Sequence, residues 1–387
     1  MVESTTAHSI KLRLSAMLTA VCLMAYYSSM PVILGRAAAS RHLEANELGL
    51  LAGLFAGGVA ITAFLALFFV RKSSWKTLIR CGAIGAGVAF ITPVYIDSLT
   101  ILLIAHLVAG LFCGLGYSVA IAFLGDTKNP TRNYAFCFVL QALTGINISY
   151  FLPRLTSTEN GFDIALILLS ALAFFSIFFS FIFPHNNTKP ASNTASKAPH
   201  CATLYILLAL FVIFLVYAGD GSVWAFTEII ALSNGLTAET AGAIVGGSLL
   251  AGAIGSFMAG VIGTRFGYLK PMSISIGLSI LSVVMLHYFH DLLSFTLAIF
   301  INGWAWNFGS GYRMGLVAAL DTSGRFTPLI TGMQLLGSSC GSIIAGLLVT
   351  EASFLWVFIF ASVLWTISLL LFYWILKRQF KTLFIGQ

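Results

Sequence analysis

Long runs of apolar residues, separated by short polar segments, extend over almost the whole chain. A membrane-spanning helix needs about 20 mainly apolar residues, because the hydrocarbon core of a bilayer is about 30 Å thick. The pattern therefore predicts an all-α integral membrane protein. Its twelve transmembrane helices are expected at residues 12–34, 47–70, 77–96, 98–124, 133–153, 163–184, 202–230, 238–263, 271–289, 292–319, 326–349 and 352–376.

The composition supports this interpretation. Hydrophobic residues make up 59% of the chain and charged residues only 9%, whereas a soluble domain carries about 25% charged residues. The net charge of +7 does not indicate nucleic acid, because no basic stripe is interleaved with aromatic residues. We therefore expect membrane lipid, and no nucleic acid, among the partners.

The positive charges indicate the orientation in the membrane, because short loops rich in Lys and Arg stay in the cytoplasm. With the N-terminus inside, only Arg36, Arg41 and Arg154 lie on the outer side, and Arg313 lies within a span. The bias predicts an inner-membrane protein with both termini in the cytoplasm. The 16 cytoplasmic residues are Lys11, Arg13, Arg71, Lys72, Lys76, Arg80, Lys128, Arg132, Lys189, Lys197, Arg265, Lys270, Arg325, Lys377, Arg378 and Lys381.

One long polar segment, Pro184 to His200, divides the chain near its midpoint. Its Asn, Thr, Ser and Pro content is typical of a flexible linker. We expect an N-terminal six-helix bundle at residues 1–184, a cytoplasmic linker at 185–201 and a C-terminal six-helix bundle at 202–387.

The second half repeats parts of the first. Asp126 recurs as Asp321 at an offset of 195 residues, and Gln141 recurs as Gln334 at an offset of 193. Further pairs share nearly the same offset. Two six-helix halves in the same orientation form parallel repeats, an arrangement in which the substrate binds at the repeat interface.

Two segments resemble a known family. The loop after the eighth predicted span reads GVIGTRFGYLK from Gly260 to Lys270, and part of the fourth span reads AHLVAGLFCGLG from Ala105 to Gly116. The first is similar to the G-x-x-x-D-R-x-G-R-[RK] signature of the major facilitator superfamily, and the second to its R-x-x-x-G-x-x-x-G-x-G helix. The resemblance extends over essentially the whole chain. It implies two bundles related by pseudo-twofold symmetry, with helices one, four, seven and ten lining a cavity.

The chain departs from the family pattern at several positions. Thr264 replaces the acidic residue of the signature, Tyr268 and Leu269 stand in the places of its two basic residues, and His106 stands where the fourth helix usually has Arg. The fifth span lacks the G-P pair of family antiporters. The resemblance places a cytoplasmic gate loop at Gly260, Arg265, Gly267 and Lys270.

The seventh predicted span contains two acidic residues. Asp220, Trp224 and Glu228 are four residues apart and share one face of a helix. Two carboxylates beside an indole can bind a cationic group or take up a proton. The alternative is that the helix ends near Gly221 and that both acids lie in water at the outer mouth.

The tenth predicted span carries Asn302, Trp306 and Arg313 on one face. A guanidinium inside a cavity is a natural partner for a carboxylate or phosphate. Alternatively, Arg313 reaches the cytoplasmic surface or pairs with an acid such as Asp321.

Four further polar residues lie in apolar spans. The imidazole of His106 titrates near neutrality, which suits proton coupling, although a hydrogen-bonded packing role is equally consistent with its position. For Tyr26, Gln141 and Gln334, hydrogen bonding between helices is the default expectation, and each is also a candidate cavity residue.

These features predict a secondary active transporter that moves a small organic solute by alternating access, with protons as the expected coupling ion. An organic anion fits Arg313 and the aromatic residues as well as a cation fits the acids, and the direction of transport stays open. Glycine pairs such as Gly337 and Gly341 are expected to serve close helix packing. We expect a monomer with no enzymatic activity, cofactor or metal. The rival interpretation is a transporter-like receptor or assembly partner that moves no solute.

Overall fold

The computed structural model describes residues 10–127, 130–156, 159–183, 200–321, 326–350 and 353–379. Two compact units divide the chain: Met1–Leu43 with Leu50–Asn193 form unit 1, and Glu44–Gly49 with Thr194–Gln387 form unit 2. Most of the predicted linker, 185–201, lies outside the described residues. The linker and the domain boundaries placed on it therefore stay predictions.

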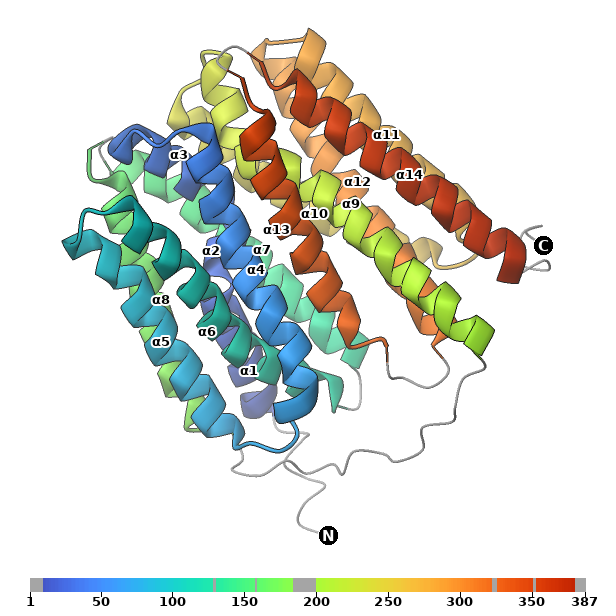
Figure 1. The fold of residues 1–387 in the computed structure, drawn as a ribbon, viewed down its shortest axis with the longest axis horizontal. Helices are drawn as coiled ribbons and strands as arrows, with labels where there is room; N and C mark the ends of the chain where they lie inside the picture. The colour runs from blue at the N-terminus through green and yellow to red at the C-terminus, as the bar shows by residue number, and fades with distance from the viewer. Residues whose placement is uncertain are drawn as a thin grey trace. The chain divides into compact units, whose positions relative to one another are not determined.

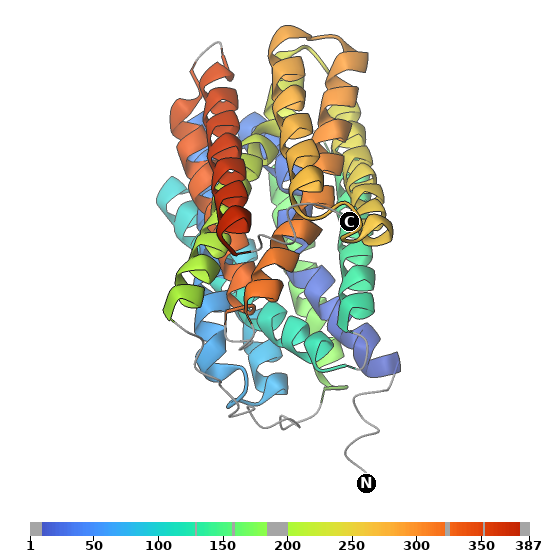
Figure 2. The same cartoon turned by 90° about the vertical axis from the view of Figure 1, so that its right-hand side faces the viewer.

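Long helices dominate both units (Figure 1). Unit 1 contains most of α4 and all of α1 (Ile10–Leu23), α2 (Ala25–Ser28), α3 (Met30–Arg41), α5 (Trp75–Tyr95), α6 (Leu99–Gly125), α7 (Pro130–Leu155) and α8 (Gly161–Ser180), and α4 itself spans Ala45–Phe69. Unit 2 contains α9 (His200–Ser233), α10 (Ala238–Ile262), α11 (Leu269–Tyr288), α12 (Leu292–Leu320), α13 (Leu329–Leu348) and α14 (Leu355–Gln379). Within each unit the long helices run alongside one another in two perpendicular views (Figure 2).

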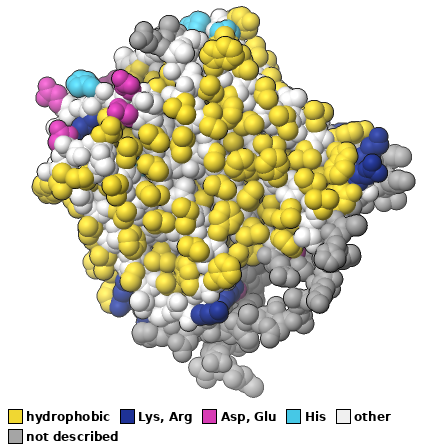
Figure 3. Space-filling model, in the orientation of Figure 1, with side chains coloured by type: hydrophobic (Ala, Val, Ile, Leu, Met, Phe, Trp, Pro, Cys, Tyr) yellow, Lys and Arg dark blue, Asp and Glu magenta, His cyan; other side chains and the backbone are white. Residues whose placement is uncertain are grey.

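Ten of the described helices are long and apolar enough to cross a membrane: α4 to α11, α13 and α14. The two other predicted spans correspond to the broken segment α1–α3 and to α12, which is 29 residues long. Hydrophobic side chains cover most of the visible face of each unit, and charged side chains lie toward its ends (Figure 3). The helix count supports a multi-pass membrane protein, while the number twelve stays a prediction.

The first predicted span is interrupted twice. The backbone leaves the helical conformation at Met24 and at Ser29, so that α2 is only 4 residues long. Pro31 explains the second break, because proline has no N–H to donate to the carbonyl of Tyr27 and its ring would clash there. At this break the Ser29 hydroxyl donates to the Ala25 carbonyl at 2.7 Å. Tyr26 is carried by this short segment.

Glycine allows the closest approach between helices in unit 2. A Cβ atom at Gly341 of α13 would collide with the backbone carbonyl of Ala218 in α9, and one at Gly337 would collide with that of Phe214. The expected packing role of these two glycines is confirmed. The close contact brings polar side chains of α13 within reach of α9.

Ion pairs hold loops and helix ends together in unit 1. Arg41, at the end of α3, donates to Asp97 and, at 2.7 Å, to Asp163 at the start of α8. Arg71, in the loop after α4, donates to both carboxylate oxygens of Asp126 at the end of α6. This hydrogen bonding raises the pKa of Arg71 above its ordinary value. Arg71 therefore stays charged under all ordinary conditions.

Candidate functional site

Helix α9 carries the two acids of the seventh predicted span through the interior of unit 2. It continues without a break to Ser233, well past Gly221. The side chain of Asp220 is 1% exposed and that of Glu228 is 0% exposed. The alternative in which the helix ends near Gly221 and leaves both acids in water is therefore wrong.

Asp220 is directed toward α14. Its Oδ1 accepts a hydrogen bond of 3.0 Å from the indole Nε1 of Trp365, a fully buried residue. Its Oδ2 is buried and has no hydrogen-bond partner among the described residues. The carboxylate is therefore held by one oxygen, while the other keeps its hydrogen-bonding capacity.

Arg313 of α12 is the second buried charge. It is 1% exposed, and its Nη2 donates to the backbone carbonyl of Trp306 at 2.9 Å and to the Ser310 hydroxyl at 2.8 Å. Its Nε and Nη1 are buried and make no hydrogen bond with any described residue. Arg313 neither reaches the surface nor pairs with Asp321, whose Oδ2 accepts hydrogen bonds from the Phe326 and Thr327 amides. Both alternatives considered for Arg313 are therefore wrong.

Tyr217 connects three helices beside Arg313. Its hydroxyl accepts a hydrogen bond of 2.8 Å from Gln334 of α13 and lies 3.3 Å from the Ser310 hydroxyl. The guanidinium carbon of Arg313 lies 5.8 Å from the centre of the Tyr217 ring. Gln334 thus makes the helix-to-helix hydrogen bond expected from the sequence.

Aromatic rings complete this region. The Trp306 ring centre lies 5.7 Å from that of Tyr217 and 6.0 Å from that of Trp224. These contacts join the facing sides of α9 and α12. We use the name polar cluster for the set Tyr217, Asp220, Trp224, Trp306, Ser310, Arg313, Gln334 and Trp365, all of which belong to unit 2.

The polar cluster holds two opposite charges that are not in ion-pair contact. Asp220 and Arg313 nevertheless lie near enough to interact electrostatically. In a low-dielectric interior such an interaction is much stronger than in water. A change in the protonation of Asp220 would therefore change the electrostatic energy of Arg313. An ion bound at Arg313 would likewise change the free energy of protonating Asp220.

Sequence reasoning found five members of the polar cluster and missed Tyr217, Ser310 and Trp365. Two of these could have been recognised from their spacing in the sequence. Tyr217 precedes Asp220 by three residues and Ser310 precedes Arg313 by three, so each shares a helical face with a charged residue. Trp365 could not have been recognised in this way, because it lies 145 residues from Asp220 in the sequence.

Three candidate residues lie apart from the polar cluster. Asn302 donates to the Ser282 hydroxyl of α11 at 3.0 Å, so it joins α12 to α11 instead. Gln141 contacts Cys137 on its own helix in unit 1, with 3.4 Å between Nε2 and Sγ, rather than another helix. Glu228 is buried on α9 eight residues beyond Asp220, and no hydrogen bond or ring contact links it to Asp220 or Arg313 among the described residues.

Tyr26 and His106 meet in the core of unit 1. Their ring centres are 5.4 Å apart, and Phe90 and Phe162 also pack against His106. His106 Nδ1 lies 2.8 Å from the Leu102 carbonyl, as in the hydrogen-bonded packing role. The Tyr26 hydroxyl and His106 Nε2 are buried without a hydrogen-bond partner among the described residues. Among the described residues, the Tyr26 hydroxyl therefore does not make the interhelical hydrogen bond expected from the sequence.

The loop matched to the family gate has a glycine-dependent backbone. Gly263 and Gly267 have positive φ angles of 55° and 69°, a conformation that other residues adopt only with strain. Arg265 and Lys270 are exposed. Tyr268, in place of a basic residue, packs against the apolar cluster formed by Ala259, Phe308 and Tyr312. The side chain of Tyr268 thus attaches this loop to α12.

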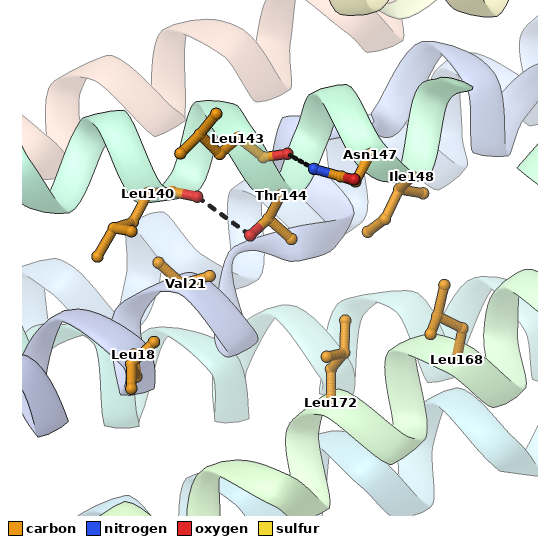
Figure 4. A pocket seen from close by; sticks show the side chains of 9 residues that line it. All are labelled: Leu18, Val21, Leu140, Leu143, Thr144, Asn147, Ile148, Leu168 and Leu172. Atoms are coloured by element: carbon orange, nitrogen blue, oxygen red, sulfur yellow. Dashed lines mark hydrogen bonds between the residues drawn. The ribbon is translucent and has the colours of Figure 1, made fainter. Parts of the chain in front are cut away.

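A cavity of about 310 Å³ lies between α1, α7 and α8 of unit 1 (Figure 4). Its polar residues, Thr144 and Asn147, each donate a hydrogen bond to a backbone carbonyl four residues earlier. The other lining residues are apolar, and no site residue predicted from the sequence is among them. Among the described residues, no group of three or more His, Cys, Asp or Glu is placed to hold a metal ion.

Comparisons with known proteins support the resemblance found in the sequence. Residues 209–383 match the model of the Major Facilitator Superfamily. The matched segment makes this part of the chain similar to that superfamily. The resemblance seen in the sequence is thus confirmed. No curated protein matches the chain in sequence.

Solved structures of two transporters share the fold of this chain. The nucleoside transporter NupG has a TM-score of 0.73 at 13% identity, and the match covers 95% of this chain and 98% of that one. A bacterial homologue of the human lysosomal transporter Spinster has a TM-score of 0.69 at 13% identity, covering 89% of this chain and 82% of that one. At such identities the likeness shows the fold alone. The chain is a multi-pass membrane protein of this fold.

Proposed function

We propose that this protein is a secondary active transporter that moves a small organic solute across the inner membrane by alternating access, with protons as the coupling ion. The observation that carries the proposal is the buried pair of charges, Asp220 on α9 and Arg313 on α12. A charged side chain at the centre of a membrane helix costs about 2.5–3.5 kcal/mol on insertion scales. Apolar residues would pack these helices at no such cost, so a functional role accounts for both charges.

The surroundings of Asp220 support the proposed proton coupling. Its Oδ2 has no hydrogen-bond partner among the described residues and can carry a proton, while Trp365 holds Oδ1. Adding a proton removes one of two interacting charges in the polar cluster. A ligand or proton shifts a conformational equilibrium only through its different affinity for the two states. The charge state of Asp220 supplies such a difference.

The test replaces Asp220 by asparagine, which keeps the size of the side chain and an acceptor for Trp365. We expect Asp220→Asn to abolish solute accumulation driven by a proton gradient in proteoliposomes, and to flatten the pH dependence of flux. Exchange of solute across the membrane without a gradient should persist. Asp291→Asn is the matched control, because Asp291 is an exposed residue that precedes α12 and asparagine is an equally good N-cap. Unchanged pH dependence in Asp220→Asn would remove this residue from the coupling mechanism.

Solutes are found by a ligand screen on the purified protein, with thermal stability as the readout, followed by counterflow with the hits. Nucleosides belong in that screen because NupG is a nucleoside transporter. Ligands that bind but are never moved would favour the receptor alternative. The proposal also includes a lipid-embedded monomer with both termini in the cytoplasm.

A further inference from the structure

The two buried charges of the polar cluster differ in what surrounds them. Asp220 is hydrogen-bonded to Trp365, which is fully buried in α14. A Cβ at Gly219, the residue before Asp220, would also contact the Trp365 ring. Asp220 and Trp365 are therefore both enclosed by buried side chains of unit 2. A solute would have to displace core side chains to reach the Asp220 carboxylate.

Arg313 has accessible neighbours. The residues that contact its guanidinium, namely Trp306, Ser310 and Tyr217, are only half-buried, and so is Gln334 beyond them. A solute that approaches this side of α9 and α12 therefore meets the Arg313 region before it meets Asp220. Both charges are buried, but the cation is the one whose neighbours are partly exposed.

Arg313 also has donors to offer. A guanidinium carries five N–H groups, and the two hydrogen bonds that Arg313 donates to Trp306 and Ser310 both use Nη2. The N–H groups of Nη1 and Nε make no hydrogen bond with any described residue. Hydrogen bonds from a guanidinium to a carboxylate are about twice as strong as neutral ones. An anion at this position would satisfy donors that the protein leaves unused.

The aromatic residues beside Arg313 fit an apolar, planar group. The Trp306 ring lies within 6.0 Å of both Trp224 and Tyr217, measured between ring centres, and is itself half-buried. Aromatic rings pair favourably at centroid separations of about 4.5–7 Å. A ring attached to the anionic group could therefore pack against Trp306 while the anion reaches Arg313.

We propose that the solute is an organic anion, with its carboxylate bound by Arg313 and its apolar part packed against Trp306 and Tyr217. This inference rests on the proposed transport function and names the substrate class of the same site. Protonation of Asp220 removes a negative charge near the bound anion, so the anion and a proton are taken up together. The cationic solute, which the sequence left equally open, is the disfavoured alternative.

The test compares three probes of one shape and different charge: benzoate, benzamide and benzylammonium. Their binding to the purified protein is followed by intrinsic tryptophan fluorescence, because Trp224 and Trp306 adjoin the site. We expect benzoate to bind at least tenfold more tightly than benzamide, and benzylammonium to bind most weakly. Equal affinities, no binding of any probe, or tightest binding of benzylammonium would overturn the inference.

Variants of Arg313 test the same point. Arg313→Lys keeps the charge but not the planar set of donors, and should weaken benzoate binding about tenfold, while Arg313→Gln should abolish it. Benzamide affinity should change in neither variant. If these variants fail to fold, the comparison of the three probes on the unmodified protein still decides, because it needs no substitution.

Flux measurements separate this inference from the proposed function. Proton-driven uptake of a neutral nucleoside or a cation, together with no preference for benzoate, would overturn the inference and leave the transport function standing. Selective benzoate binding in a protein that moves no solute would support the anion site and overturn the transport function. Proton-driven uptake of aromatic anions supports both.

Discussion

Two buried tyrosines illustrate how the same side chain acts differently in different surroundings. The Tyr217 hydroxyl accepts a hydrogen bond from Gln334, whereas the Tyr26 hydroxyl is buried without a partner among the described residues. A typical hydrogen bond contributes about 1 kcal/mol to stability, and leaving a buried polar group unsatisfied costs about 1–3 kcal/mol. The two hydroxyls should therefore have opposite effects on stability.

Replacing each tyrosine by phenylalanine tests this difference. Tyr26→Phe removes an unsatisfied hydroxyl and keeps the ring, so thermal stability in detergent should stay equal or rise. Tyr217→Phe should lower the free energy of unfolding by about 1 kcal/mol, because the Gln334 donor loses its acceptor. Each variant is the control for the other. A large loss of stability in Tyr26→Phe would show that its hydroxyl is satisfied in the membrane. Lost transport in a stable Tyr26→Phe would instead indicate a functional role.

At the scale of helices, glycine spacing sets the distance between α9 and α13. The backbone carbonyl of Ala218 occupies the place that a side chain at Gly341 would need. Backbone atoms cannot move aside as flexible side chains do. The hydrogen bond between Gln334 and Tyr217, and with it one edge of the polar cluster, depends on this close approach.

Gly341→Ala should therefore separate the two helices. We expect a loss of about 1–3 kcal/mol, the usual cost of overpacking a well-packed interface, together with weaker solute binding. Gly277→Ala in α11 is the matched control, since a Cβ there meets nothing within 4 Å. Alanine is a better helix former than glycine by about 1 kcal/mol, so the control should be neutral or more stable. Melting curves of the two purified variants give the comparison. Equal stability of both would contradict the packing argument.

At the scale of the whole molecule, the distribution of Lys and Arg predicts the orientation. Ser73, in the loop between α4 and α5, should face the cytoplasm, and His290, between α11 and α12, should face the outside. Cysteines are introduced at these positions after the 6 native cysteines have been replaced. An impermeant maleimide should label His290→Cys in intact cells and Ser73→Cys only after permeabilisation. The reverse pattern would refute the assigned topology.

The positions of the helices could be predicted from the sequence because they depend on local chemistry. An apolar run long enough to cross a bilayer forms a helix whichever partners it packs against, since its backbone groups must bond within the segment. Ten of the predicted spans correspond to described helices of suitable length and hydropathy. The exceptions have local features: Pro31 breaks the first span, and α12 carries polar residues such as Asn302 and Arg313.

The contacts of the candidate site were decided only by the tertiary structure. The sequence placed Asp220 and Trp224 on one helical face, but it did not show that Trp365 binds Asp220 across 145 residues or that Gln334 binds Tyr217 across 117. It also left open which of the two buried charges has partly exposed neighbours. Such pairings depend on which helices pack together and at what distance. Close packing between distant segments sets both, and no local pattern of residues encodes them.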